Sequence, residues 1–436
     1  MKQNVVLIVT DQQQAQALGC VNSSYKTPNL DKLAARGVRF SHNYCASGQC
    51  TPSRAAMMTG CYPHEVGVLQ IGHALSQQYR TIGKHFREAG YHTAYFGKWH
   101  LFADIKDHGF DTIDYREDGV DHGTIDPSEQ TQQGLDARAT AKALNFLSEV
   151  SDQQPFFLVI SWYAPHPPFR AIDPYVDQFS LEDMPVPVSF YQDDLSSKPS
   201  WQKIRAAYGE SLLTEEQVRE DARNYRSQVS YLDWNVGRVL DILEQRRIID
   251  RTVVVFTTDH GDMQGSHRLR YKGVLSYEEL YRIPLIIYDP NRNPARKVIS
   301  DLVSNVSLPA TLAELAGLPV PEKFHGASLV DKLTAQEISG EQMIYIEHWK
   351  AYWGFHPLRG LITPHWKYVY YFEDKAEELY DREDDPHELV NQADNPSYQD
   401  IKTDLRVQVD DWWSRTGGLT VKPIEVKTAG WIDPSR

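Results

Sequence analysis

Short apolar runs alternate with stretches of helical periodicity through much of the chain. The candidate strands are rich in β-branched and aromatic residues, as is typical of strands that are covered on both faces. They lie at residues 5–9, 93–96, 156–162, 252–257 and 285–288. Strands that alternate with helices in this way predict an α/β fold with a large, mostly parallel sheet flanked by helices.

The helical stretches carry their own start and stop signals. Residues 75–86 repeat apolar positions at steps of four, three and four, and the pattern ends at Gly90. A longer helix opens with Thr214 and Gln217 in capping-box spacing. A third helix is expected over residues 308–316. These helices supply the apolar faces that would cover the sheet.

The pattern changes near residue 335. Three runs beyond it, at residues 343–348, 358–363 and 367–372, predict antiparallel strands. An amphipathic helix follows, with apolar residues from Ile401 to Trp412, and the last 18 residues are predicted to be extended. Such a tail often docks on another subunit, so a homo-oligomer is a possible arrangement.

We therefore expect two units. Residues 1–335 would form a catalytic α/β domain, and residues 336–436 a smaller α+β subdomain with a C-terminal tail. Residues 173–210 are rich in Pro, Ser and Asp and are predicted to form a long surface excursion near the site.

Composition narrows the possible partners. The 436 residues include 45 basic and 59 acidic side chains, for a net charge of −14. This balance argues against nucleic acid and anionic membranes as partners. No apolar run approaches the roughly 20 residues of a membrane span. The four cysteines form no disulfide framework, and the chain enters its first strand without a signal peptide, so a cytoplasmic protein is expected.

Polar clusters follow four of the predicted strands. They are Asp11-Gln12, Lys98-Trp99-His100, His166 and Asp259-His260-Gly261-Asp262. Ligands bind outside the carboxyl ends of strands in open α/β sheets, so the four clusters predict one pocket. Taken singly, Asp11 also fits a turn or a helix cap, and Asp259-His260-Gly261 also fits a turn. A single Lys or His is more often a solvated side chain or a satisfied core group.

Two of these clusters contain donors suited to a divalent metal. Asp11, Gln12, Asp259 and His260 offer two carboxylates, an amide oxygen and an imidazole. These are hard to borderline ligands, and they suit Ca²⁺, Mg²⁺ or Mn²⁺, with Ca²⁺ favoured.

A cysteine precedes a predicted helix at residues 52–59. Thr51 fits the N-cap, Pro52 the first helical position, and Gly60 the C-terminal stop. Cys50 would then lie just outside the positive end of the helix, with Arg54 one turn further on, in a place that favours an anion such as sulfate or phosphate. The plainer alternative is a buried structural cysteine.

The stretch Cys50-Thr51-Pro52-Ser53-Arg54-Ala55-Ala56 resembles the signature of the type I sulfatases, of the alkaline phosphatase superfamily. In that family the cysteine is oxidised by a formylglycine-generating enzyme to formylglycine. Gly97-Lys98-Trp99-His100, Ala164-Pro165-His166-Pro167-Pro168 and Tyr271-Lys272-Gly273 also resemble family motifs. The resemblance implies an alkaline-phosphatase-like sandwich and a metal that Cys50 also contacts. The family usually has a second acidic residue where this chain has Gln12.

The resemblance also implies a role for each residue. A formylglycine hydrate at residue 50, oriented by the metal and Arg54, would attack sulfur. Lys98 and Lys272 would stabilise charge on the sulfuryl oxygens. His166 would protonate the leaving alcohol, helped by Lys272, and His100 would deprotonate the second hydroxyl.

We expect a small sulfated mono- or oligosaccharide as the substrate. Residues placed in its pocket on composition alone are His73, Arg170, Trp349 and Trp353. One alternative is a phosphonate monoester or phosphodiester hydrolase with the same thiol signature. Another is a binding protein for sulfated glycans in which Cys50 is not converted.

Overall fold

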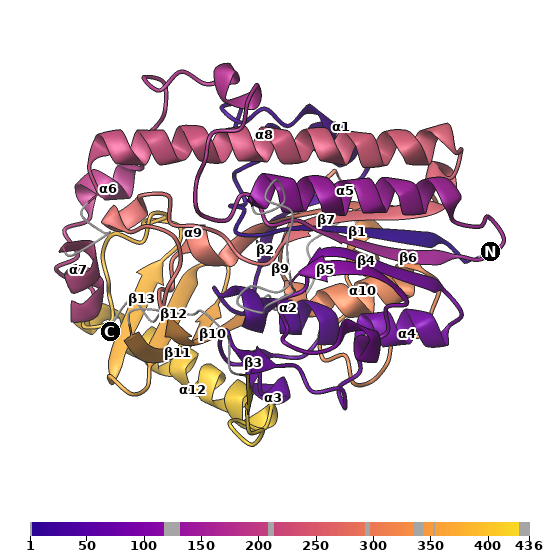
Figure 1. Ribbon diagram of the computed structural model, residues 1–436. Coiled ribbons are helices and arrows are strands. Elements are labelled where there is room, and N and C mark those ends of the chain that lie inside the picture. The colour runs from indigo at the N-terminus through magenta and orange to yellow at the C-terminus, as the bar shows by residue number, and fades with distance from the viewer. Residues whose placement is uncertain are drawn as a thin grey trace.

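An eight-stranded sheet forms the centre of the molecule (Figure 1). The computed structural model describes residues 2–116, 131–207, 213–292, 297–334, 343–351 and 354–426. The strands are β1 (Asn4–Thr10), β2 (Val38–Tyr44), β4 (His92–Lys98), β5 (Thr112–Arg116), β6 (Phe156–Ser161), β7 (Thr252–Thr258), β8 (Arg282–Tyr288) and β9 (Val298–Ser304). Their order is β5-β4-β6-β1-β7-β8-β2-β9, and β8 runs antiparallel to both of its neighbours. The predicted mostly parallel sheet is confirmed.

Helices cover both faces of this sheet (Figure 1). One layer contains α1 (Pro28–Arg36), α5 (Gln132–Glu149) and α8 (Glu215–Gln245), and the other contains α2 (Cys50–Thr59), α4 (Ile82–Glu88), α10 (Leu308–Leu315) and α11 (Val330–Thr334). Along β1, Val6 and Ile8 pack under the first layer while Val5, Leu7 and Val9 pack under the second. Because side chains alternate across a strand, a continuous apolar run is what such a central strand requires.

Two predicted helix starts are wrong by a few residues. α4 begins at Ile82 rather than near Leu75, because the Thr81 side chain accepts the Lys84 N–H and caps the helix there. α2 begins at Cys50, so Thr51 is inside the helix and is not its N-cap. The N-cap is Gln49, whose extended backbone accepts the Ser53 N–H at 3.0 Å. The capping box at Thr214 and Gln217 is confirmed.

An antiparallel sheet follows, as predicted, but it has four strands rather than the three expected. Its strands are β10 (Ile344–Ala351), β11 (Gly354–Ile362), β12 (Trp366–Tyr371) and β13 (Ala376–Asp381), and α12 (Gln399–Arg415) packs against it. The tail returns to its own chain, where β14 (Ile424–Glu425) pairs with β3 (His73–Ala74). The division near residue 335 stays a prediction.

The remaining helices are short. They are α3 (Pro63–Val66), α6 (Val188–Gln192), α7 (Ser200–Ala207) and α9 (Glu278–Tyr281), with single 3₁₀ turns between the longer elements. Two of these helices, α6 and α7, lie within the surface excursion predicted at residues 173–210. Within the described ranges, no helix has both the length and the apolarity needed to cross a membrane.

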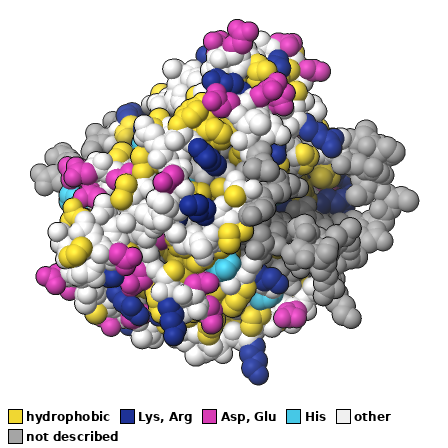
Figure 2. All heavy atoms as spheres, turned by 90° about the vertical axis from the view of Figure 1, so that its left-hand side faces the viewer, with side chains coloured by type: hydrophobic (Ala, Val, Ile, Leu, Met, Phe, Trp, Pro, Cys, Tyr) yellow, Lys and Arg dark blue, Asp and Glu magenta, His cyan; other side chains and the backbone are white. Residues whose placement is uncertain are grey.

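The face shown in Figure 2 carries a mixed surface. Acidic and basic side chains are intermingled on its described part, with hydrophobic side chains between them. A nucleic-acid-binding face typically carries a basic stripe, and the described side chains of this face form none.

Candidate active site

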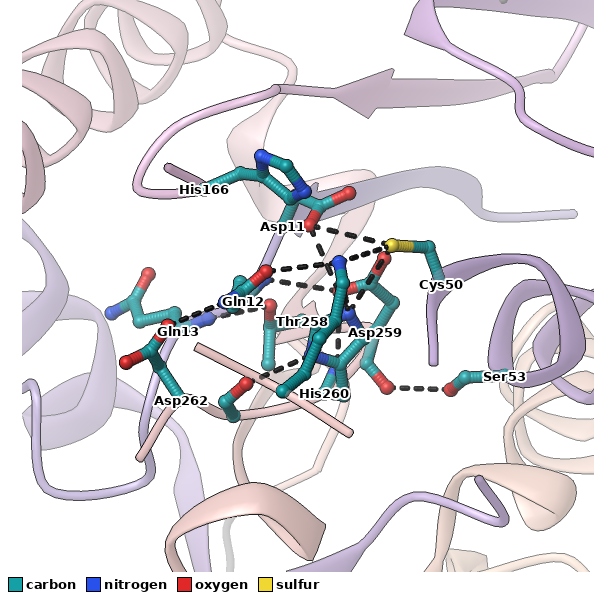
Figure 3. Close-up of polar contacts among 12 residues, drawn as sticks. Asp11, Gln12, Gln13, Cys50, Ser53, His166, Thr258, Asp259, His260 and Asp262 are labelled. Carbon is teal, nitrogen blue, oxygen red and sulfur yellow. Dashed lines mark hydrogen bonds and ion pairs between the residues drawn. The ribbon is translucent and has the colours of Figure 1, made fainter. Parts of the chain in front are cut away.

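The catalytic candidates converge at the carboxyl ends of β1, β7 and β2 (Figure 3). Asp11 follows β1, Asp259 follows β7, and the segment after β2 leads to Cys50 at the first position of α2. Lys272 comes from the loop between β7 and α9. Residues from these strand ends are thus brought together in one buried cluster, which includes Cys50.

Arg54 bridges the two acidic groups of this pocket. Its Nε lies 2.8 Å from Asp259 Oδ2 and its Nη2 lies 3.1 Å from Asp11 Oδ2, and all three side chains are buried. The other guanidinium nitrogen donates to Ser161 Oγ at 2.8 Å and to the Lys98 carbonyl at 3.0 Å. Every guanidinium nitrogen of Arg54 is thus engaged, so its role here is to hold both carboxylates in place.

Lys98 adds a second cation to Asp11. Its Nζ lies 2.9 Å from Asp11 Oδ2. Burial alone would raise the pKa of Asp11, but the nearby cations, Lys98 above all, hold that pKa well below its ordinary value. Asp11 is therefore a carboxylate at neutral pH.

Lys272 contacts the cysteine directly. Its Nζ lies 2.7 Å from Cys50 Sγ, 2.9 Å from Gln12 Oε1 and 3.2 Å from His260 Nε2. Cys50 is fully buried, and burial together with Asp11 raises the pKa of its thiol to about 11 despite Lys272. The thiol is therefore a poor nucleophile at neutral pH.

His260 presents an unprotonated nitrogen to the same point. Its Nδ1 lies 2.8 Å from the Gly261 carbonyl, which can only accept a hydrogen bond, so Nδ1 carries the proton. Burial lowers the pKa of His260 to about 4, with Lys272 adding to the fall and Asp259 opposing it. The lone pair of Nε2 then faces Cys50 Sγ at 3.3 Å, as it would face a metal.

The turn after β1 is held at every amide. The bonds run from Asp11 N to Ala164 O, Gln12 N to Asp259 Oδ1, Gln13 N to Thr258 Oγ1 and Gln14 N to the Tyr225 hydroxyl, at 3.3, 3.0, 3.2 and 2.8 Å. Gln12 itself has a φ of 70°, in the left-handed region that non-glycine residues rarely adopt. These bonds therefore hold a strained residue in position at the centre of the site.

The two remaining histidines that were predicted to be catalytic lie on segments that follow β4 and β6. His166 is half-buried beside Asp11 (Figure 3), and its Nδ1 lies 2.6 Å from the Pro167 carbonyl. His100 is buried, has a φ of 58° and lies next to the Phe102 ring. Their catalytic roles stay predictions.

The residues predicted to bind substrate are placed differently from one another. His73 is buried in β3 and accepts the Leu69 N–H, and Trp349 is buried against Phe372. Arg170 is exposed. Trp353 lies outside the described residues.

Sequence reasoning missed His348, the neighbour of Trp349. It is fully buried on β10, and burial lowers its pKa to about 3. The nearby His260 and Lys272 lower the pKa further, and a hydrogen bond with the Lys350 backbone opposes this shift. His348 shares its face of β10 with Ile346, which packs into the cluster that contains Leu269 and Leu275. It therefore approaches the site from the second sheet.

The donors fit a divalent cation. Asp11, Cys50, Asp259 and His260 offer ligand atoms that all lie within 4.8 Å of one another. Gln12 Oε1 and His260 Nε2 already contact a cation, the Lys272 ammonium. Two carboxylates, an amide oxygen and an imidazole nitrogen are ligands that Ca²⁺, Mg²⁺ and Mn²⁺ accept.

A profile described as "Sulfatase" matches residues 3–318. The chain belongs to the sulfatase family. A second profile, described as "N-sulphoglucosamine sulphohydrolase, C-terminal", matches residues 265–414. The chain is thus a sulfuric ester hydrolase, and the fold expected from the resemblance is confirmed.

Individual relatives agree with this assignment. The sulfatase is 31% identical to the choline-sulfatase of Rhizobium meliloti, over 91% of this chain and 83% of that protein. It superposes on a 2-O GAG sulfatase with a TM-score of 0.82 and 27% identity, covering 98% and 95% of the two chains. It shares its fold with the phosphonate monoester hydrolase of Agrobacterium radiobacter, with a TM-score of 0.78 at 21% identity and coverage of 98% and 100%.

Proposed function

We propose that this sulfatase hydrolyses the sulfate ester of a small sulfated saccharide, with formylglycine at position 50 and a divalent metal. The observation that carries the proposal is the convergence of Cys50, Asp11, Asp259, His260 and Lys272 at one buried point. Calcium is the metal that the oxygen-rich donor set favours.

The proposed reaction depends on two groups that the genetically encoded side chains do not provide, formylglycine and a metal ion. The formylglycine hydrate would supply an oxygen nucleophile with a second hydroxyl, and the metal would supply positive charge. Asp11, Gln12, Asp259 and His260 would hold the metal. Cysteine itself lacks the second hydroxyl needed to release a covalent intermediate, and its raised pKa also argues against direct attack.

The chain's own residues bind and orient the sulfate group. Lys272, whose Nζ touches Cys50 Sγ, would stabilise negative charge on the sulfuryl oxygens, together with Lys98. Arg54 holds the two carboxylates in place through its ion pairs with both. His166 would give a proton to the leaving alcohol, and His100 would accept one from residue 50.

The substrate class rests on relatives. The 2-O GAG sulfatase acts, by its name, on a sulfated glycan, and it covers nearly the whole chain. A phosphonate or phosphodiester hydrolase is the second candidate, because the same fold carries that activity in a neighbour. A cytoplasmic location, transient contact with the enzyme that forms formylglycine, and a homo-oligomer stay predictions.

The test compares sulfated mono- and disaccharides, an aryl sulfate, a phosphodiester and a phosphonate ester, with release of free sulfate or phosphorus acid as the readout. We expect sulfate release to dominate. Cys50→Ala and Cys50→Ser should each abolish turnover, and intact mass of the Cys50 peptide should show the conversion to formylglycine. Full activity in either variant would defeat the proposal, and an unconverted, inactive protein that binds sulfated glycans would favour the binding alternative.

A further inference from the structure

Gln12 occupies a position between a group that can only donate and a group that accepts. On one side, the Lys272 ammonium donates to Gln12 Oε1 at 2.9 Å. On the other side, Gln12 Nε2 donates to Asp262 Oδ2 (Figure 3). An ammonium has no acceptor, so the amide oxygen must face Lys272 and the amide nitrogen must face Asp262. The orientation of this amide therefore follows from its neighbours.

Asp262 is itself fixed by bonds outside the pocket. Its Oδ1 accepts the Gln264 N–H at 2.7 Å and Gln264 Nε2 at 3.0 Å. Its backbone carbonyl accepts Gln14 Nε2 at 2.6 Å. Asp262, Gln12 and Gln14 are all buried, so bulk solvent does not compete for these hydrogen bonds. Oδ2 is thus held at one place, and that place determines which end of the Gln12 amide faces the pocket.

We propose that Asp262 is a positioning residue that aims the carbonyl oxygen of Gln12 at the metal. The inference rests on the proposed function, because it takes Gln12 as a ligand. It also accounts for an amide at position 12, because an amide presents a donor to Asp262 and an acceptor to the metal site at the same time. Gln12 and Asp262 thus form a matched donor–acceptor pair.

The proposal predicts an asymmetric effect of Asp262→Asn. Two N–H groups of Gln264 point at the Oδ1 side, so the new amide keeps its oxygen there and turns its NH₂ toward Gln12. Gln12 must then accept with its own oxygen, and its NH₂ turns toward Lys272 and the metal position. A donor in place of a ligand should weaken metal binding about 10–100-fold, as the loss of other groups that orient metal ligands does.

Exchange of the two functional groups should restore binding. In Gln12→Glu/Asp262→Asn, the carboxylate of residue 12 accepts from the new amide on one side and offers an oxygen to the pocket on the other. The pair keeps one carboxyl group, one amide group and the same donor–acceptor match. A role of Asp262 in fold stability alone would not be rescued by a change at position 12.

The experiment titrates Ca²⁺ calorimetrically into metal-stripped wild type, Asp262→Asn, the double variant and Asp233→Asn. Asp233 on α8 is a matched control. It is also a buried carboxylate, and it accepts the backbone N–H groups of Asn29 and Leu30 at the start of α1. We expect weaker binding in Asp262→Asn, affinity within about threefold of wild type in the double variant, and no change in the control.

Wild-type affinity in Asp262→Asn, or a double variant no tighter than that single variant, overturns the inference alone. Wild type that binds none of Ca²⁺, Mg²⁺ and Mn²⁺ overturns the proposed metal as well. Circular dichroism checks the fold of each variant. Should Asp262→Asn not fold, a folded double variant that binds Ca²⁺ more than about tenfold weaker than wild type still refutes the exchange.

Discussion

Replacing Arg54 by Met tests whether this guanidinium stabilises the molecule through two buried carboxylates. Methionine keeps the length of the side chain and removes its charge and donors. The buried Asp259 would lose its ion pair with Arg54, while Asp11 would keep Lys98 at 2.9 Å. Removing one partner of a buried ion pair typically costs about 3–5 kcal/mol, because the other charge is left uncompensated.

This loss of unfolding free energy can be converted to an expected decrease in melting temperature. Unfolding entropies of about 2.1 cal/mol/K per residue give about 0.9 kcal/mol/K for a chain of this length, so the variant should melt about 3–6 °C lower. The measurement is differential scanning calorimetry of metal-stripped protein. The deficit should be largest at neutral pH. It should shrink as the pH falls below the ordinary carboxylate value of 3.8 and through the lowered pKa of Asp11, because a protonated Asp11 no longer needs the cation.

Arg36→Met supplies the matched control. The ion pair of Arg36 with Glu244 has a length of 2.7 Å, close to the 2.8 Å of Arg54 with Asp259, but its side chains are 31% and 39% exposed. An exposed pair contributes about 0–1 kcal/mol, so this variant should melt within about 1 °C of wild type. Equal melting temperatures for the two variants would refute the argument from burial.

Two further predictions concern histidines. His166→Ala should reduce the rate of hydrolysis of alkyl sulfates about 10²-fold more than that of aryl sulfates, because an aryl alcohol is a good leaving group and needs no proton. An equal loss of initial rate on both substrates would contradict the role of His166 as the acid. His64→Asn should lower the free energy of unfolding more at pH 6 than at pH 9, as measured by chemical unfolding. Burial opposes protonation of His64, but Glu347 at 3.0 Å raises the pKa of His64 above its ordinary value of 6.5. The stabilisation by protonated His64 is therefore complete below the ordinary value of 6.5 and is lost as the pH rises through the raised pKa. A deficit independent of pH would exclude this linkage.

The proximity of Asp11 and Asp259 could be predicted from the sequence because the strands that precede them are central. Continuous apolar runs mark β1 and β7 clearly, and parallel strands place Asp11 and Asp259 at the same edge. The strand that leads to Cys50 was missed. β2 contains Ser41, His42 and Asn43, so its pattern is neither continuous nor alternating, and its partners β8 and β9 come more than 200 residues later.

Contacts between distant segments were beyond sequence reasoning. Tyr225 reaches the turn after β1 from α8, and Asp262 meets Gln12 only because β7 lies beside β1. Local signals were also incomplete. Thr51 is a residue type that often caps helices, but the helix begins earlier, after the extended backbone of Gln49. Cys50 is therefore in the first turn of the helix.

The complete burial of Cys50 has a consequence for its proposed conversion to formylglycine. No part of its side chain is accessible in the folded chain, and every residue of α2 around it is buried as well. Under the proposed function, an oxidising enzyme would have to meet this segment before the chain folds. Protein produced without that enzyme should stay inactive when the enzyme is added to it after folding, and unfolding it first should make the thiol available.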